Sequence, residues 1–168
     1  MVSNKELYPE SYFEERLSND PKRQQAFRSE SDFIKKHIKS GRLLDIGCST
    51  GEFINALEWN GDAFGMEISS YAIEKAKKQR IRFDHDIFNS ENFFDIITIR
   101  GTIQHLDMPF IYMRKSYTAL KKGGYLVFLA TPNTNSIYYK LWRDLPALDN
   151  KLNFLIPSDI MLKNALQN

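Results

Sequence analysis

Cysteine is almost absent from this sequence, so no disulfide can form within the chain. Cys48 is the single cysteine among 168 residues. No N-terminal apolar stretch resembles a signal peptide, and no apolar run is long enough to span a bilayer. These absences favour a reducing compartment, so we expect a cytoplasmic protein with no membrane partner.

An excess of charge of one sign is also missing. The chain carries 23 Lys and Arg against 21 Asp and Glu, spread along its length, for a formal net charge of +2. No long basic run offers an arm for nucleic acid, so we expect no nucleic-acid partner. Repeats and low-complexity tracts are absent as well. A chain of this length with 42% hydrophobic residues can bury one core but not two full domains.

Short apolar runs alternate with helical patterns through the middle of the chain. Five runs are typical of strands: RLLDI (42–46), AFGMEI (63–68), IRFDHDI (81–87), FFDIITIR (93–100) and YLVFLA (125–130). Helices are expected between them at 52–59, 69–80 and 108–122, the last one stopped by Gly123 and Gly124. This order predicts an α/β fold with a doubly wound, mainly parallel, Rossmann-like sheet of about five strands flanked by helices.

Further helices are expected on either side of this core. Upstream, residues 9–17 and 21–40 carry apolar residues at helical spacing, with Pro21 at a first helical position and Gly41 as a stop. Downstream, residues 135–145 and 157–167 are better helices than strands, and LNFLI (152–156) is a weak strand candidate.

The loop Gly47-Cys48-Ser49-Thr50-Gly51 after the first strand allows two interpretations. It matches the G-x-S-x-G pattern, in which Ser49 would be a hydrolase nucleophile. Such a serine needs an oxyanion donor from an earlier strand-to-helix loop, and no strand precedes this one. In the second interpretation, which we favour, the glycines let the backbone approach a cofactor. The spacing departs from G-x-G-x-x-G, which argues against NAD or FAD.

An acidic residue stands where the second predicted strand ends. Glu67 lies about 20 residues after Gly47, the separation at which a carboxylate grips the hydroxyls of a cofactor ribose. A merely solvated acid at a strand end is the alternative. Position and spacing favour the ribose role, with both hydroxyls bound by one carboxylate.

Five segments in order resemble the class I S-adenosylmethionine-dependent methyltransferases. They are DIGCSTG (45–51), GMEIS (65–69), DHDI (84–87), FDIITIRGTIQHL (94–106) and LKKGGYLVFLATPN (120–133). Each is weak alone, and their common register carries the resemblance. YPESYFEE, GTIQHL and ATPNTNS are similar to a bacterial small-molecule group that includes ubiquinone-pathway O-methyltransferases and sugar-modifying enzymes.

The resemblance implies S-adenosyl-L-methionine as cofactor, no metal, and methyl transfer to a small-molecule acceptor, where we expect a hydroxyl. It assigns roles to a set of cofactor-binding residues: Asp45, Gly47, Cys48, Ser49 and Gly51 around the methionine part, Glu67 on the ribose, Ile68 against the adenine, Asp86 and Ile87 at the adenine amino edge, and Arg100 and Gly101 beside the sulfur. Ser49 replaces a commoner glycine and fits if its backbone dihedral angles are ordinary.

Candidates for the acceptor side are fewer. His105 is the histidine best placed as a general base, although a histidine at a helix start is often structural. Arg100 is expected to bind an anionic acceptor or the cofactor carboxylate. His85 is expected at the edge of the adenine site, and His37 in solvent. The aromatic residues Tyr8, Tyr12 and Phe13 suit a lid or ordinary core packing, and Tyr138, Tyr139 and Trp142 stay unassigned.

The resemblance also divides the chain into an N-terminal helical lid segment (1–41), a cofactor-binding Rossmann-like core (42–132) and a C-terminal helical segment (133–168). Related enzymes usually continue with an antiparallel hairpin, so this chain looks C-terminally shortened. We therefore expect YLVFLA to be an apolar sheet edge that forms a homodimer or lowers solubility. Two alternative functions stay open: a cofactor-binding fragment without turnover, and an NAD-binding dehydrogenase.

Overall fold

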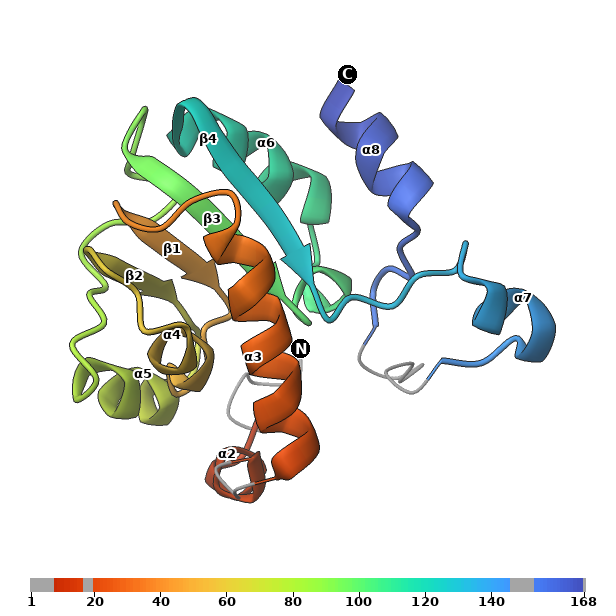
Figure 1. The fold of residues 1–168 in the computed structure, drawn as a ribbon, viewed down its shortest axis with the longest axis horizontal. Coiled ribbons are helices and arrows are strands. Elements are labelled where there is room, and N and C mark those ends of the chain that lie inside the picture. Colours follow the sequence, from red (N-terminus) through yellow and green to blue (C-terminus); the bar gives the residue numbers. More distant parts are fainter. Residues whose placement is uncertain (1–7, 17–19, 146–152, 168) are drawn as a thin grey trace.

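The computed structural model describes residues 8–16, 20–145 and 153–167. Helices α2 (Glu10–Arg16) and α3 (Pro21–Lys35) precede the sheet (Figure 1). The central elements are β1 (Leu43–Ile46), α4 (Glu52–Leu57), β2 (Ala63–Met66), α5 (Ser70–Lys77), β3 (Phe94–Arg100), the 3-10 helix η1 (Ile103–His105), α6 (Pro109–Ala119) and β4 (Leu120–Leu129). Helices α7 (Ile137–Trp142) and α8 (Asp159–Gln167) follow.

The strands form one parallel sheet in the order β2-β1-β3-β4. The central strand β1 is buried along its whole length, and Leu43 pairs with Ala63 on one side and Ile96 on the other. The direction of winding reverses between β1 and β3, which is where ligands of such sheets bind. The predicted α/β architecture with a doubly wound parallel sheet is confirmed.

Apolar side chains on the two faces of the sheet form two core clusters. On one face, Phe27 and Ile34 of α3 pack with Phe53 of α4 and Ala76 of α5. On the other face, Met113 of α6 and Leu162 of α8 pack against the strands. Figure 1 shows the same division, with α3, α4 and α5 in front of the sheet and α6 behind it. Helices on both faces leave the strand ends as the open region of the core.

The prediction of a strand at 81–87 is wrong, because this segment contributes only an isolated bridge between Arg82 and Phe64. Arg82 exchanges two backbone hydrogen bonds with β2, donating to Ala63 O at 2.9 Å and accepting from Gly65 N at 2.8 Å. The chain then turns, since Asp86 Oδ1 accepts from the backbone N–H of Phe88 and Asn89. The sheet therefore has four strands in the described residues instead of about five.

Two predicted helix ends are also wrong. Helix α3 begins as expected, with Pro21 in its first turn and Asp20 accepting from Lys22 N, but it ends at Lys35. Gly41 lies where the chain enters β1, and a Cβ there would be 2.6 Å from Asp95 Oδ2. Close approach to Asp95 explains this glycine better than a helix stop does.

Helix α6 ends at Ala119, before the glycine pair expected to stop it. Gly123 and Gly124 lie inside β4, where the pairing jumps from Phe94–Leu120 to Ile96–Tyr125. Gly123 has a φ of +82°, which suits an irregular bulge that side-chain-bearing residues adopt at a cost.

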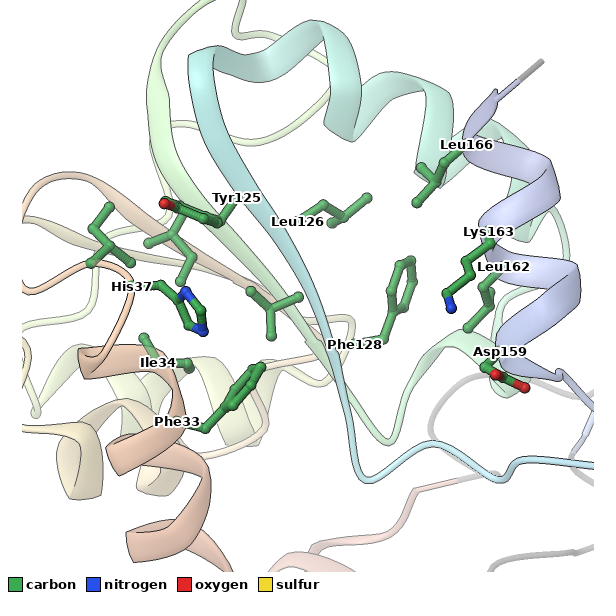
Figure 2. A pocket seen from close by; sticks show the side chains of 13 residues that line it. Phe33, Ile34, His37, Tyr125, Leu126, Phe128, Asp159, Leu162, Lys163 and Leu166 are labelled. Carbon is green, nitrogen blue, oxygen red and sulfur yellow. The ribbon is translucent and has the colours of Figure 1, made fainter. Parts of the chain in front are cut away.

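Strand β4 is an edge of the sheet, as predicted, because β3 is its only strand partner in the described part of the chain. A groove of about 410 Å³ runs along this edge between α3 and α8. Figure 2 shows Phe33 of α3 and His37, just after that helix, on one side of β4, and Lys163 and Leu166 of α8 on the other. Tyr125 is 40% exposed there, so the edge presents apolar surface.

The C-terminal region adds helices and no strand within the residues that the structure describes. Helices α7 and α8 are shorter than predicted. LNFLI is not a strand at 153–156, and its first residue lies outside the described ranges. Phe154 N and Leu155 N donate instead to Gln104 O, at 2.8 and 3.3 Å. No helix in the described residues is long and apolar enough to cross a membrane.

Candidate active site

The loop after β1 has a tightly wound backbone that faces the end of β2. Gly47, Ser49 and Gly51 have φ angles of +76°, +52° and +86°. Gly47 N and Cys48 N both donate to Met66 O, at 2.8 and 3.1 Å, which fixes the loop to β2. The condition set for Ser49 is therefore not met, because a left-handed φ is costly for serine and ordinary for glycine.

Glu67 braces this loop against the loop after β2. Its Oε2 accepts from Ser49 N at 3.0 Å, and its Oε1 accepts from Ile68 N at 2.8 Å and Ser69 N at 3.0 Å. A carboxylate has about four acceptor positions, so about one stays available, on Oε2. The expected contact, in which one carboxylate binds both ribose hydroxyls, needs two acceptor positions, and the backbone N–H groups leave about one.

A cavity of about 1040 Å³ opens at the carboxyl ends of β1, β2 and β3. Most of the predicted cofactor-binding residues line it: Asp45, Gly47, Cys48, Ser49, Glu67, Ile68, Asp86, Arg100 and Gly101. His105 lines it too. These residues come together because carboxyl ends of neighbouring parallel strands meet at one edge of a sheet, and their role in binding a cofactor stays a prediction.

Three of the predicted residues lie elsewhere. Gly51 starts α4 behind the loop, where a Cβ would be 2.3 Å from Ile81 Cδ1. The Ile87 side chain is 1% exposed and belongs to the core. His85 is stacked on Phe93, with ring centroids 4.3 Å apart, and is not part of the cavity lining. The aromatic cluster around Phe93 accounts for His85, whereas His37 is exposed as expected.

Two buried ionisable groups, the carboxyl of Asp45 and the thiol of Cys48, line the cavity. Burial raises the pKa of Asp45 to about 7, against the hydrogen bond that Thr98 Oγ1 donates to its Oδ1 at 2.7 Å. Burial, together with the charges of Asp45 and Glu67, raises the pKa of the Cys48 thiol well above its usual range. Cys48 is therefore an unreactive packing residue there.

Both arginines that line the cavity are ion-paired. Arg100 donates from Nε to Glu30 Oε2 at 2.6 Å, and Arg23 donates to Glu52 Oε2 at 2.8 Å. The Arg100 guanidinium also lies over the Phe27 ring, 4.6 Å from its centroid. The expectation that Arg100 binds a ligand anion now has a competing partner, Glu30. The sequence offered a signal for it, because residues 23, 27 and 30 share one face of α3.

Gln104 orients the ring of His105. Its Nε2 donates to Gly101 O at 3.1 Å, which identifies the amide nitrogen, and the same atom lies 3.3 Å from His105 Nε2. A donor facing Nε2 makes that ring atom an acceptor, so neutral His105 carries its proton on Nδ1 in this arrangement.

Aromatic residues from the N-terminal segment cover the cavity. Tyr8, Tyr12 and Phe13 all line it, and Phe13 is 3% exposed and tilted against Tyr71 of α5 at 6.0 Å. Phe13 is thus a packed core residue that also borders the cavity, and the lid role of this segment stays a prediction. The unassigned aromatics lie on α7, which has no buried residue. The sequence did not predict three other residues that line the cavity: Asp107, Tyr112 and Phe154.

A family model described as a methyltransferase domain matches residues 18–167. The chain belongs to this methyltransferase domain family. Among curated proteins, it is 30% identical over 128 residues to phosphoethanolamine N-methyltransferase 1 of Triticum aestivum, covering 66% of this chain and 26% of the relative. It is 29% identical over 108 residues to the ubiquinone biosynthesis O-methyltransferase of Pelagibacter ubique, covering 58% and 45%.

Solved structures of methyltransferases share the fold of this methyltransferase domain. A SAM-dependent methyltransferase from Thermotoga maritima superposes with a TM-score of 0.67 at 24% identity, covering 93% of this chain and 78% of that one. A SAM-dependent methyltransferase from Archaeoglobus fulgidus superposes with a TM-score of 0.67 at 20% identity, and the match covers 92% of this chain and 71% of that one. The chain spans half or less of the length of the curated relatives named above, 26% and 45%.

Proposed function

We propose that this methyltransferase domain binds S-adenosylmethionine in the cavity at the strand ends and methylates a hydroxyl of a small molecule. The observation that carries the proposal is the Glu67 brace, which fixes a carboxylate between the two loops that bound the cavity. The fold family supports the cofactor, and the cavity volume of about 1040 Å³ can accommodate it together with a small acceptor.

The residues present fit this cofactor. The remaining acceptor position of Glu67 suits a ribose hydroxyl, and Ile68, 59% exposed at the cavity, offers apolar surface for a purine ring. Asp45 and the turn at Ser49 would hold the methionine part, and Asp86 would lie near the adenine. When bound, S-adenosylmethionine supplies a methyl group already activated on a sulfonium.

The protein's task is then to hold the acceptor in line and keep water out. Tyr12 and Phe13 of α2 line the cavity, and we propose that they help to exclude solvent from it. His105 faces the same space, and we propose that it orients the acceptor hydroxyl or takes its proton. Taking the proton at Nε2 requires the ring to leave Gln104, whose Nε2 lies 3.3 Å from that ring atom.

Calorimetry tests the cofactor. We expect S-adenosylmethionine and S-adenosylhomocysteine to bind and NAD not to bind. Binding of NAD alone would replace the proposal with a dehydrogenase function. Formation of S-adenosylhomocysteine with an acceptor would then separate an active enzyme from a domain that only binds the cofactor.

Glu67→Ala is expected to weaken cofactor binding by roughly 1 to 3 kcal/mol, because a ribose hydroxyl loses its acceptor and the two loops lose their brace. Isothermal titration with S-adenosylhomocysteine measures the loss, and thermal unfolding of the free protein reports the structural share. Glu74→Ala removes an exposed acid from α5 and is the matched control. Equal affinities of the Glu67 and Glu74 variants would rule out the ribose contact.

A further inference from the structure

The cavity holds no cation ready for an anionic acceptor. Its lining contains Arg23 and Arg100 but no lysine among the described residues. Arg23 pairs with Glu52 at 2.8 Å and Arg100 with Glu30 at 2.6 Å, and the four side chains are only 17% to 21% exposed. A phosphate or carboxylate on the acceptor would have to displace a glutamate from a partly buried ion pair. Breaking such a pair costs more free energy than a solvent-exposed ion pair with the ligand would contribute.

Carboxylates outnumber these paired arginines around the same space. Glu67, Asp86 and Asp107 line the cavity in addition to the paired Glu52. Asp45 lines it too, but burial raises its pKa to about 7, so it does not count as a full negative charge. Asp107 and Asp86 act on one part of the wall, because their charges, after burial, raise the pKa of Tyr112. This part of the cavity therefore favours a cation over an anion.

Asp107 and the aromatic residues Tyr8, Tyr12 and Phe154 line the cavity without a proposed role in cofactor binding. Asp107 is exposed, and no ion pair in the described ranges neutralises it. Phe154 is 71% exposed and lies against η1, because its N–H donates to Gln104 O at 2.8 Å, three residues before Asp107. Tyr8 and Tyr12 also line the cavity, with their rings edge to face at 5.3 Å. A carboxylate and an exposed aromatic ring in the lining of one cavity form an arrangement that attracts an organic ammonium ion.

We infer that the acceptor is a hydroxylated molecule that carries a protonated amine. Its ammonium group would lie at the rim formed by Asp107 and the aromatic rings. Anionic analogues would bind more weakly, because both arginines of the cavity already have glutamate partners. The inference rests on the proposed function, since it assigns the cofactor to the other part of the cavity. It adds the charge of the acceptor, which the cofactor assignment does not determine.

Three probes of nearly equal shape test the charge: tyramine, which is a cation, 4-ethylphenol, which is neutral, and 4-hydroxyphenylacetate, which is an anion. Each is titrated into protein saturated with S-adenosylhomocysteine. We expect tyramine to bind about tenfold more tightly than 4-hydroxyphenylacetate, with 4-ethylphenol between them. Equal affinities, a preference for the anion, or no binding of any probe to the loaded protein would overturn the inference. Failure of S-adenosylhomocysteine itself to bind would instead overturn the proposed function.

A variant pair assigns the preference to the rim. Asp107→Asn is expected to reduce the tyramine preference from about tenfold to about twofold and to leave S-adenosylhomocysteine binding unchanged. Asp32→Asn removes an equal charge from the exposed face of α3, outside the cavity lining, and should keep the full preference. An unchanged preference in Asp107→Asn would show that the rim does not hold the ammonium.

Discussion

Ser49 occupies a backbone position that suits glycine. Its φ of +52° lies in the left-handed region, and its N–H still donates to Glu67 at 3.0 Å. The hydroxyl is therefore not what the loop requires at this position. The match of the loop to the G-x-S-x-G pattern is a coincidence of spacing, because the residue contributes its backbone geometry to a loop that lies against the proposed cofactor.

Ser49→Gly is expected to raise the free energy of unfolding by about 0.5 to 1 kcal/mol, because glycine adopts a left-handed φ without steric cost. Chemical denaturation measures the change. Ser49→Ala keeps the Cβ and should bring no gain, while both variants should bind S-adenosylhomocysteine within a few fold of the unmodified protein. A loss of stability in Ser49→Gly would mean that the serine hydroxyl stabilises the loop.

Asp45 gives the free protein a predictable pH dependence. Its pKa is raised by burial to about 7, so between about pH 4 and about pH 7 the unfolded chain loses this proton while the folded chain keeps it. The unfolded state then binds fewer protons, and stability falls as pH rises through that window, by at most about 4 kcal/mol.

Asp45→Asn is expected to remove this fall. The variant should unfold at a higher temperature than the unmodified protein above pH 7, and the difference should vanish near pH 4, where both carry an uncharged group at position 45. Thermal unfolding across that pH range measures it, with Asp32→Asn as the control. A difference that does not depend on pH would contradict the raised pKa.

At the scale of elements, α3 is joined to the end of β3 by the Arg100–Glu30 pair, 2.6 Å long and partly buried. Glu30→Gln is expected to lower the free energy of unfolding by about 1 to 2 kcal/mol, because it leaves the Arg100 charge without its partner in a half-buried place. Replacing both residues, Glu30→Leu with Arg100→Met, should recover most of the loss.

Thermal unfolding of the single and double variants measures this coupling. Lys77→Ala breaks an exposed pair on α5, whose partner Glu74 lies 3.0 Å away, and should change stability by less than about 0.5 kcal/mol. A Glu30→Gln variant as stable as Lys77→Ala would show that solvent already screens the Arg100 pair.

The elements that sequence periodicity predicted well are those buried on both faces. The runs at 42–46 and 93–100 are mostly apolar, and they contain β1 and β3. The run at 81–87 has Ile and Phe at alternate positions as well, but the side chain of Asp86 accepts from two backbone N–H groups in a turn that a hydrophobic pattern does not predict. Core packing of Ile87 and stacking of His85 on Phe93 likewise keep these two side chains out of the cavity lining. Cavity residues from distant segments, such as Phe154, depend on tertiary contacts that local spacing does not contain.

At the scale of the whole molecule, β4 leaves a row of backbone groups and apolar side chains on one side of the sheet. Residues 125–129 include no charge, which is unusual for an edge strand. We propose that two copies of the chain pair through this edge, with the groove between α3 and α8 receiving the partner strand (Figure 2).

Tyr125→Lys tests the pairing, because a charge at the 40% exposed Tyr125 blocks strand addition. Sedimentation velocity should show a concentration-dependent dimer for the unmodified chain and a monomer for the variant. Tyr117→Lys, on the 76% exposed Tyr117 of α6, is the control and should still dimerise. A strictly monomeric unmodified chain would count against the proposal.

The three backbone hydrogen bonds that Glu67 accepts give its carboxylate a structural role in addition to the cofactor contact proposed for it. Its neighbour Ile68 contributes its backbone N–H to one of these hydrogen bonds, and the residue is 59% exposed. A redesign that accepts S-adenosylmethionine analogues with a larger purine group should therefore keep Glu67 and change residue 68. Ile68→Ala would make room for a bulky purine substituent and leave the hydrogen bonds between the loops intact.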